Sequence, residues 1–506
     1  MKPPPLSSLE YAESELVVGL VYAAGTNARL LEDALVNHIE KFGYQANIIR
    51  LSEQLGPLIK SLNLKVKLKN SPEYERVSTR MDAGNKARAR VGRADLLALA
   101  AVTEICKQRR VAGTSEVMPK TAHILFSLKR PEEVFALRRV YGRGFFLIGV
   151  FASEKDRLKY LQFDKGIPED KARALIERDQ EEKEQQEPFG QRTRDTFHLA
   201  DVFVRMKGDE YKIQSWRFLD LIFGNPYETP TQDENAMYLA SAASLRSAQL
   251  GRQVGAAIAD NQGDVIGVGC NDVPCAGGGL YWAGESDQRD HKKGEDSNER
   301  CRNEIISDIM KRLRPKVHPQ KRIAEGKRLL VDSPLMDITE FGRAVHAEME
   351  AVLACVRSGV SPREGSLYTT TFPCHNCTRH IVAAGIRRVV YIEPYPKSRA
   401  FELHDDSIRD AQDRDVENGD KRVAFEPFVG VGPRRYFDLF SMRMGTGYEV
   451  RRKTENGKTV SWEKSAARLR VPMLPNSYLQ REKLAVSEYS RATEKSGGHS
   501  EARSEP

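Results

Sequence analysis

The chain reads His346-Ala347-Glu348 and, after 24 intervening residues, Pro373-Cys374-His375-Asn376-Cys377. One histidine nitrogen and two cysteine thiolates make a three-ligand zinc set whose fourth position stays open, which is typical of catalytic rather than structural zinc. The sequence therefore predicts that His346, Cys374 and Cys377 bind Zn²⁺.

Glu348 lies two residues after the first predicted ligand, within reach of a water on the metal but outside the usual ligand set. Zinc lowers the pKa of its water, so that hydroxide can attack C4 of a cytosine ring before ammonia leaves. A glutamate that carries the protons contributes roughly 100- to 10,000-fold to such a rate. His-x-Glu with Pro-Cys-x-x-Cys is the pattern of zinc nucleobase deaminases, and we expect Glu348 to be the catalytic proton shuttle.

The local pattern predicts two helices that meet over the metal. Residues 344–357 have a helical apolar face. After the strand-like run 367–371, Pro373 is expected at the first position of a helix, which brings both cysteines to one face. Two alternatives stay open: a redox Cys-x-x-Cys pair, and a closed structural zinc site that recruits His375 or His380 as fourth ligand.

The composition indicates the general class of the protein. The chain has 506 residues, 79 basic against 71 acidic side chains, a net charge of +8 and seven cysteines. It lacks an apolar run of membrane-spanning length and has too few cysteines for a disulfide scaffold, so we expect a cytoplasmic protein of two or three domains with no membrane partner. The diffuse positive charge suits free nucleotides at least as well as polynucleotides.

The N-terminal part predicts a P-loop arrangement. Residues 15–21 resemble a buried strand, 22–27 a glycine-bearing turn and 30–42 a helix. Gly19, Gly25 and Thr26 are the candidate nucleotide-binding residues, although Gly25 stands where the motif has lysine. Apolar runs at 122–127 and 145–150 add a parallel sheet. The domain is expected to bind an NTP or phosphate, or to be purely structural, rather than to act as a kinase.

From Glu234 the pattern changes to a helix, a hairpin over 252–269 and the two metal helices. This part resembles the deoxycytidylate deaminase family through Arg252-x-Val254-Gly255-Ala256, Gly269-Cys270-Asn271-Asp272-x-Pro274 and the two metal motifs, over about residues 234–445. The resemblance implies the same three ligands, the same glutamate and a sugar-hydroxyl contact from Asn271. Asn271 has the alternative role of capping the exit of the hairpin.

The whole chain resembles bacterial two-domain anti-phage dCTP deaminases, because the N-terminal part also carries Ser127-Leu128-Lys129-Arg130-Pro131-Glu132-Glu133-Val134 and Leu137-Arg138-x-x-Tyr141-Gly142. That resemblance implies deamination of dCTP and dCMP, which would deplete dCTP during phage infection. It also implies a homo-oligomer and an unknown silencing factor. A polynucleotide-editing deaminase and a nucleotide-binding regulator with a vestigial site are the alternative functions.

The expected fold is α/β. It comprises an N-terminal extension (1–14), a degenerate P-loop-kinase-like parallel-sheet domain (15–230), a cytidine-deaminase-like α/β/α domain (231–450) with an insertion at about 275–341, and a C-terminal extension (451–506). That extension is predicted to be disordered after about residue 482, where the sequence turns polar and charged. The insertion contains Cys275, His291 and Cys301, which are candidates for a second metal.

Overall fold

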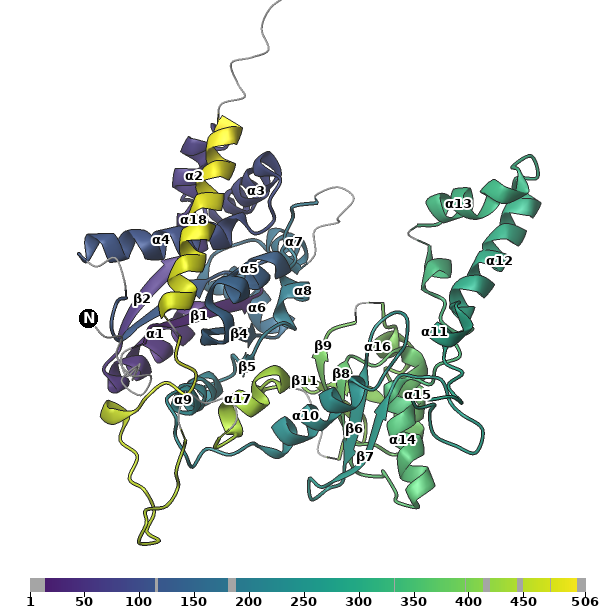
Figure 1. The fold of residues 1–506 in the computed structure, drawn as a ribbon. Coiled ribbons are helices and arrows are strands. Elements are labelled where there is room, and N and C mark those ends of the chain that lie inside the picture. Colours follow the sequence, from purple (N-terminus) through teal and green to yellow (C-terminus); the bar gives the residue numbers. More distant parts are fainter. Residues whose placement is uncertain are drawn as a thin grey trace, which may run out of the picture. The chain divides into compact units, whose positions relative to one another are not determined.

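The computed structural model describes residues 14–113, 117–180, 188–331, 333–395, 397–412, 419–443, 449–473 and 475–497. They form two compact units (Figure 1). Unit 1 combines the chain up to Pro230 with the chain from Val429 onward, and unit 2 is Thr231–Phe428. Both units are α/β, as the sequence predicts. Within the described residues, no helix is both long and apolar enough to cross a lipid bilayer.

Unit 1 is built on a sheet with the strand order β12-β5-β4-β1-β3-β2. All neighbouring strands run parallel except the antiparallel β12–β5 pair. The parallel sheet is therefore confirmed, whereas its likeness to a kinase stays a prediction. The strands are β1 (Leu16–Tyr22), β2 (Gln45–Arg50), β3 (Thr121–Phe126), β4 (Phe145–Phe151), β5 (Val202–Arg205) and β12 (Gly430–Val431).

Helices cover both faces of this sheet, which is why its central strands are continuous apolar runs. One side of β1, with Leu16, Val18 and Leu20, packs in one core with residues of α1 and α9. The helices of unit 1 are α1 (Ala28–Ile39), α2 (Leu55–Ser61), α3 (Glu73–Val91), α4 (Leu96–Val111), α5 (Pro131–Tyr141), α6 (Glu154–Lys159), α7 (Glu169–Gln180), α8 (Thr193–Phe197), α9 (Glu210–Ile222), α17 (Tyr436–Phe440) and α18 (Pro475–Gly497).

The second boundary predicted from the sequence, at residue 450, is wrong, because the chain rejoins unit 1 at Val429. Gly430 and Val431 extend the first sheet by pairing with β5. Arg435 is then buried against Asp201, 3.3 Å away, and Asp438, 2.9 Å away. The short strand β12 and the buried ion pairs of Arg435 therefore hold this part of the chain in unit 1. Neither feature produces a periodic pattern that could be recognised in the sequence.

The predicted disorder after residue 482 is also wrong, since α18 continues to Gly497. Glu482 is 1% exposed and pairs with the buried Arg109 of α4, and the Tyr478 hydroxyl donates to Glu15 over 2.5 Å. The polar composition of this segment thus reflects a helix held partly by buried charges. Residues 1–13 and 498–506 of the predicted extensions lie outside the described residues.

Unit 2 has a sheet with the order β10-β11-β9-β8-β6-β7. Strands β6 and β7 form the predicted hairpin, β6 pairs antiparallel with β8, and the remaining pairs are parallel. The strands are β6 (Gly255–Ala259), β7 (Val265–Cys270), β8 (Ser366–Thr371), β9 (Arg388–Glu393), β10 (Ile408–Asp410) and β11 (Val423–Pro427).

The glycines of the hairpin let helices approach both faces of this sheet. A Cβ on Gly269 would lie 2.4 Å from the backbone nitrogen of Ala351 in α14, and one on Gly255 would lie 1.9 Å from the carbonyl oxygen of Ala240 in α10. The result is an α/β/α unit. Its helices are α10 (Gln232–Ser244), α11 (Asp290–Lys293), α12 (Ser297–Leu313), α13 (Pro319–Leu329), α14 (Ala347–Ser358), α15 (His375–Ala383) and α16 (Ala400–Leu403).

The predicted insertion contains α11, α12 and α13. It leaves and rejoins the domain at one place, because the backbone nitrogen of Val345 donates to the carbonyl oxygen of Asp272 over 3.0 Å. An insertion closed in this way adds helices while the end of β7 and the start of α14 stay side by side.

Glu15 gives a testable electrostatic feature of unit 1. Burial alone would raise its pKa, but hydrogen bonds from His123 and Arg109 lower it from 4.5 to about 2. A carboxyl with a depressed folded-state pKa stabilises the fold fully above its ordinary pKa, and this stabilisation is lost as pH falls towards 2. The difference corresponds to about 3 kcal/mol.

We expect Glu15→Gln to lower the melting temperature at pH 7 and to flatten its dependence on pH between 4.5 and 2, because the titrating carboxyl is gone. Thermal unfolding across this pH range measures both effects. Glu488→Gln, at a half-exposed glutamate of α18, is the control and should keep the parent profile. An unchanged pH profile in Glu15→Gln would contradict the assignment.

Candidate metal centre

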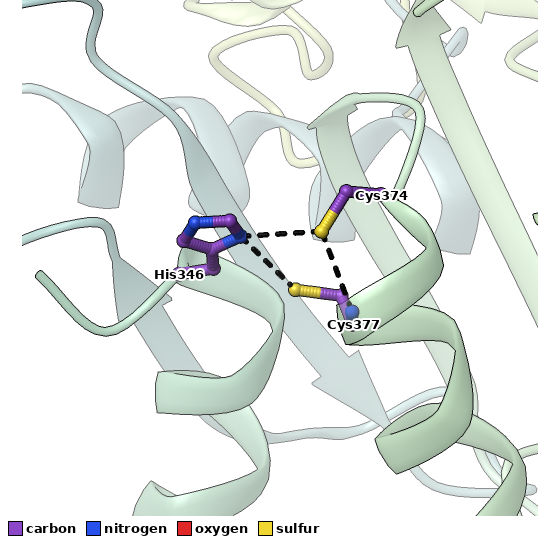
Figure 2. Close-up of side chains that lie close together, drawn as sticks. All are labelled: His346, Cys374 and Cys377. Carbon is purple, nitrogen blue, oxygen red and sulfur yellow. Dashed lines mark hydrogen bonds between the residues drawn. The ribbon is translucent and has the colours of Figure 1, made fainter. Parts of the chain in front are cut away.

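His346, Cys374 and Cys377 converge, as the sequence predicts (Figure 2). The His346 Nδ1 atom lies 3.4 Å from the Sγ atom of Cys374 and 3.4 Å from that of Cys377. The three ligand atoms all lie within 4.8 Å of one another. Two sulfurs and one imidazole nitrogen are donors that zinc prefers, and three protein ligands leave a coordination position for a reactant.

Two helix N-termini position these ligands. His346 is the N-cap residue of α14, and Cys374 is the N-cap of α15, where its sulfur accepts a hydrogen bond of 3.4 Å from the backbone nitrogen of Cys377. Pro373 therefore precedes the cap, and the predicted placement of Pro373 at the first helical position is wrong by two residues. The capping thiolate satisfies a backbone N–H at the positive end of the helix.

Glu348 is the second residue of α14 and is 5% exposed. Its Oε2 atom accepts a hydrogen bond of 3.5 Å from the Cys377 thiol, so the carboxyl group lies beside the ligand cluster. Burial raises the pKa of Glu348. The structure thus brings the predicted proton shuttle and the three predicted ligands into one site.

Electrostatics within the cluster favour a metal-binding state. A hydrogen bond from Cys377 lowers the pKa of the Cys374 thiol to about 4, and the same interaction raises that of Cys377. The hydrogen bond to Cys374 raises the pKa of His346 to about 9. The lowered pKa of Cys374 favours its thiolate, which is the form of cysteine that binds metals.

The alternative ligands do not join the site. Within the described ranges, the ligand group contains neither His375 nor His380, so the closed four-ligand alternative is not formed. The candidate second metal group in the insertion is not brought together either. Cys275 donates to the carbonyl oxygen of Gly278 over 3.1 Å, and His291 lies 3.5 Å from Asp287.

A cavity of about 280 Å³ opens beside His346, Glu348 and Cys374. Most of the remaining wall could not be predicted from the sequence, because its residues come from loops and from the insertion and share no regular spacing. Two of these residues had a local signal: Arg252 opens the Arg252-x-Val254-Gly255-Ala256 motif, and Phe372 directly precedes Pro373. The additional lining residues include Arg252, Asp290, Asp296, Asn298, Thr339, Thr371, Phe372 and Tyr395.

Asn271 also lines the cavity and is 9% exposed. Its amide nitrogen donates to the carbonyl oxygen of Arg252 over 2.8 Å, and its amide oxygen accepts from the backbone nitrogen of Val254 over 2.7 Å. These bonds match the alternative in which Asn271 holds the backbone at the end of the hairpin. The sugar contact stays a prediction.

The predicted P-loop residues of unit 1 do not all lie in one loop. Gly19 lies inside β1, where a Cβ would be 2.6 Å from the Leu128 side chain, so Gly19 serves packing and does not reach the loop. Gly25 is in the loop with φ +87°. Thr26 is 8% exposed, and its Oγ1 atom has no hydrogen-bond partner among the described residues.

Known proteins are similar to unit 2. Residues 230–393 match the family described as the cytidine and deoxycytidylate deaminase zinc-binding region. The C-terminal region thus contains a deoxycytidylate deaminase family domain. The deaminase domain takes Zn²⁺ as its cofactor, since the matched family region is zinc-binding and the convergent His346, Cys374 and Cys377 donors fit that ion.

Individual relatives match only parts of the chain. ComE operon protein 2 of Bacillus subtilis (strain 168) is 38% identical over 73 residues, which are 14% of this chain and 39% of that protein. Deoxycytidylate deaminase of Enterobacteria phage T4 is 37% identical over 67 residues, 13% of this chain and 34% of that protein. The chain thus spans less than two thirds of the length of these relatives. The apo structure of dCMP deaminase from cyanophage S-TIM5 is 16% identical, covering 40% of this chain and 100% of that chain with a TM-score of 0.22.

We expect Cys374→Ala to lose most of its zinc, because the variant removes one of three protein ligands and the thiolate with the lowest pKa. Elemental analysis of purified protein measures zinc per chain. Cys301→Ala, at a partly exposed cysteine of the insertion, should retain the full metal content. Zinc bound at parent stoichiometry in Cys374→Ala would refute the ligand assignment.

Proposed function

We propose that the protein hydrolytically deaminates free cytosine deoxynucleotides, dCTP, dCMP or both, to the uracil nucleotides and ammonia. The observation that carries this proposal is the buried Glu348 carboxyl beside the convergent His346, Cys374 and Cys377 group, at the wall of a cavity. Relatives named deoxycytidylate deaminase support the choice of a cytosine deoxynucleotide.

In the proposed reaction, the zinc cofactor activates water and the side chain of Glu348 transfers protons. Zinc held by the three ligands supplies Lewis acidity that makes water a nucleophile at neutral pH. Glu348 accepts a proton from the attacking water, transfers it to the ring nitrogen N3 and assists protonation of the departing amine. Water adds at C4, the bond between C4 and the exocyclic amino nitrogen breaks, and ammonia leaves. Burial of Glu348 keeps these transfers within the site.

The cavity supports a single nucleotide as substrate. Its volume of about 280 Å³ is suited to one base and sugar. Arg252 is the arginine among its lining residues and is about half exposed, with its guanidinium 3.1 Å from Glu393. We assign it to the substrate phosphates, because guanidinium groups bind phosphate oxygens in a fork geometry. A polynucleotide strand would need a longer basic or aromatic channel.

We further propose that the activity depletes dCTP in anti-phage defence, with unit 1 as the regulatory part, the chain acting as a homo-oligomer and a silencing factor restraining it. The N-terminal motifs that resemble bacterial two-domain dCTP deaminases support this role.

Product analysis tests the substrate class directly. Zinc-loaded protein is incubated separately with dCTP, dCMP, CTP and a cytosine-containing single strand, and uracil products are separated by chromatography. We expect dCTP or dCMP to be converted and the strand to stay intact. Conversion of the strand alone would replace the proposal with the editing function, and no conversion of any substrate would favour the regulator.

Glu348→Ala should retain zinc and lose about 100- to 10,000-fold in kcat, because the variant removes proton transfer but none of the ligands. Zinc content and the rate of uracil formation are measured on the same sample. Glu364→Ala, at an exposed glutamate paired with Arg387, should keep the parent rate. Turnover near the parent value in Glu348→Ala would remove Glu348 from the mechanism.

Arg252→Ala should raise KM for dCTP and dCMP about tenfold or more while kcat changes less, since a charge-assisted contact to phosphate contributes about 1.5–3 kcal/mol. Steady-state kinetics with deoxycytidine as a third substrate separate this effect from general damage. Deoxycytidine has no phosphate, so its kcat/KM should change little. An equal loss for all three substrates would contradict the phosphate contact.

A further inference from the structure

The insertion contributes one wall of the deaminase cavity. Polar side chains of this wall lie outside the motifs that carry the resemblance to deoxycytidylate deaminases, so those motifs assign them no role. The polar insertion residues that line the cavity are Asp290, Asp296, Asn298 and Thr339.

Two of these side chains are occupied by the backbone of the insertion. Asp296 accepts a hydrogen bond of 3.0 Å from the backbone nitrogen of Glu299 at the start of α12. The Asn298 amide donates to the carbonyl oxygen of Ile338 over 2.8 Å and accepts from the backbone nitrogen of Phe341 over 3.3 Å. Asp296 and Asn298 therefore hold the wall together.

Asp290, the first residue of α11, has a free acceptor. Its side chain is 5% exposed, and its Oδ1 atom accepts a hydrogen bond of 2.8 Å from the Arg343 guanidinium. Arg343 is itself held by the carbonyl oxygen of Gln288, 3.1 Å away. Among the residues that the structure describes, no donor bonds to the other carboxylate oxygen, Oδ2. Because Asp290 lines the cavity, that oxygen is available to a donor inside it.

Buried ion pairs fix the position of Asp290 relative to the metal centre. The preceding residue, Arg289, pairs with Asp287 over 2.8 Å and with Asp272 over 3.4 Å. The carbonyl oxygen of Asp272 accepts from the backbone nitrogen of Val345, which directly precedes the ligand His346. An acceptor that is held in place before binding loses little conformational freedom when a ligand arrives.

The chemistry of a carboxylate limits what Asp290 can bind. An ionised carboxylate only accepts hydrogen bonds, and it repels phosphate. The proposed cytosine deoxynucleotide has two donors, the 4-amino group of the base and the 3′-hydroxyl of the sugar. The amino group must lie at the metal centre, where C4 reacts. The 3′-hydroxyl is therefore the donor that remains for Asp290.

We propose that Asp290 accepts a hydrogen bond from the 3′-hydroxyl of the nucleotide and thereby determines the sugar specificity of the site. The inference rests on the proposed deamination of cytosine deoxynucleotides, because it requires the base to lie at the metal centre. A nucleotide without this hydroxyl would bury the Asp290 oxygen without a partner, so the site should reject it.

Calorimetric titration of the full zinc-loaded chain with dCTP and with 2′,3′-dideoxycytidine triphosphate tests the contact. The titration uses the Glu348→Ala variant, which should turn over too slowly to consume the ligand. We expect dCTP to bind about ten- to a hundredfold tighter, because the charge-assisted hydrogen bond is made by dCTP alone. The preference should be the same with and without Mg²⁺. A preference seen only with Mg²⁺ would assign the carboxylate to a cation and overturn the proposal.

Adding Asp290→Ala to this variant should bring the two affinities to within about twofold, chiefly by weakening dCTP. Asp290→Asn keeps the size of the side chain and an oxygen for Arg343, so it provides a second test if the alanine variant does not fold. It should reduce the preference about fivefold, since a neutral acceptor makes a weaker hydrogen bond. Asp308→Ala, at an exposed aspartate of α12 that pairs with Arg312, is the matched control and should keep the parent preference.

The outcomes separate this inference from the proposed function. Equal affinities for the two nucleotides without Asp290 substitution, or a preference unchanged in a folded Asp290→Ala or Asp290→Asn, would overturn the 3′-hydroxyl contact and leave deamination intact. Binding of dCTP with the expected preference, but no turnover by the chain with Glu348, would contradict the proposed function alone. Failure of dCTP to bind would overturn both.

Discussion

The metal centre depends on the close contact between α14 and β7. Gly267 and Gly269 lie under this helix, and a Cβ on Gly269 would lie 2.4 Å from one backbone atom of α14 and 2.5 Å from another. Any side chain at this position would push the helix away from the sheet. Since His346 caps α14 and Glu348 lies in its first turn, such a shift would separate both from the cysteines of α15.

Both units gather polar side chains at the carboxyl ends of their strands. In the deaminase domain, Cys374 follows the carboxyl end of β8, and Asn271 follows that of β7. In unit 1, Ala24 and Ser127 follow the carboxyl ends of β1 and β3. Loops at this edge of a parallel sheet lie close together and leave the hydrogen-bonded strands undisturbed, so reactive side chains gather there without loss of the core.

Buried charges replace apolar packing where the C-terminal segment joins unit 1. Glu15, Arg109 and Glu482 are almost fully buried, and Arg109 contacts both carboxylates. Such a network stabilises the fold only while all its members are present, because a single removed partner leaves an uncompensated buried charge. Because Glu482 and Tyr478 find buried partners in Arg109 and Glu15, this polar, charged segment forms the helix α18.

The sequence by itself determined which three donor residues converge, that Glu348 lies beside them, the parallel sheet of unit 1 and the hairpin of unit 2. These features are local: residue type and short spacing carry the chemistry of His346, Cys374 and Cys377, and apolar runs mark buried strands. Only the tertiary structure decided where the deaminase domain ends, that α18 is ordered, that Gly19 packs inside a strand and which insertion residues line the cavity. These features depend on contacts between residues far apart in the chain, such as Arg109 with Glu482, and no local pattern records which partner a buried charge will find.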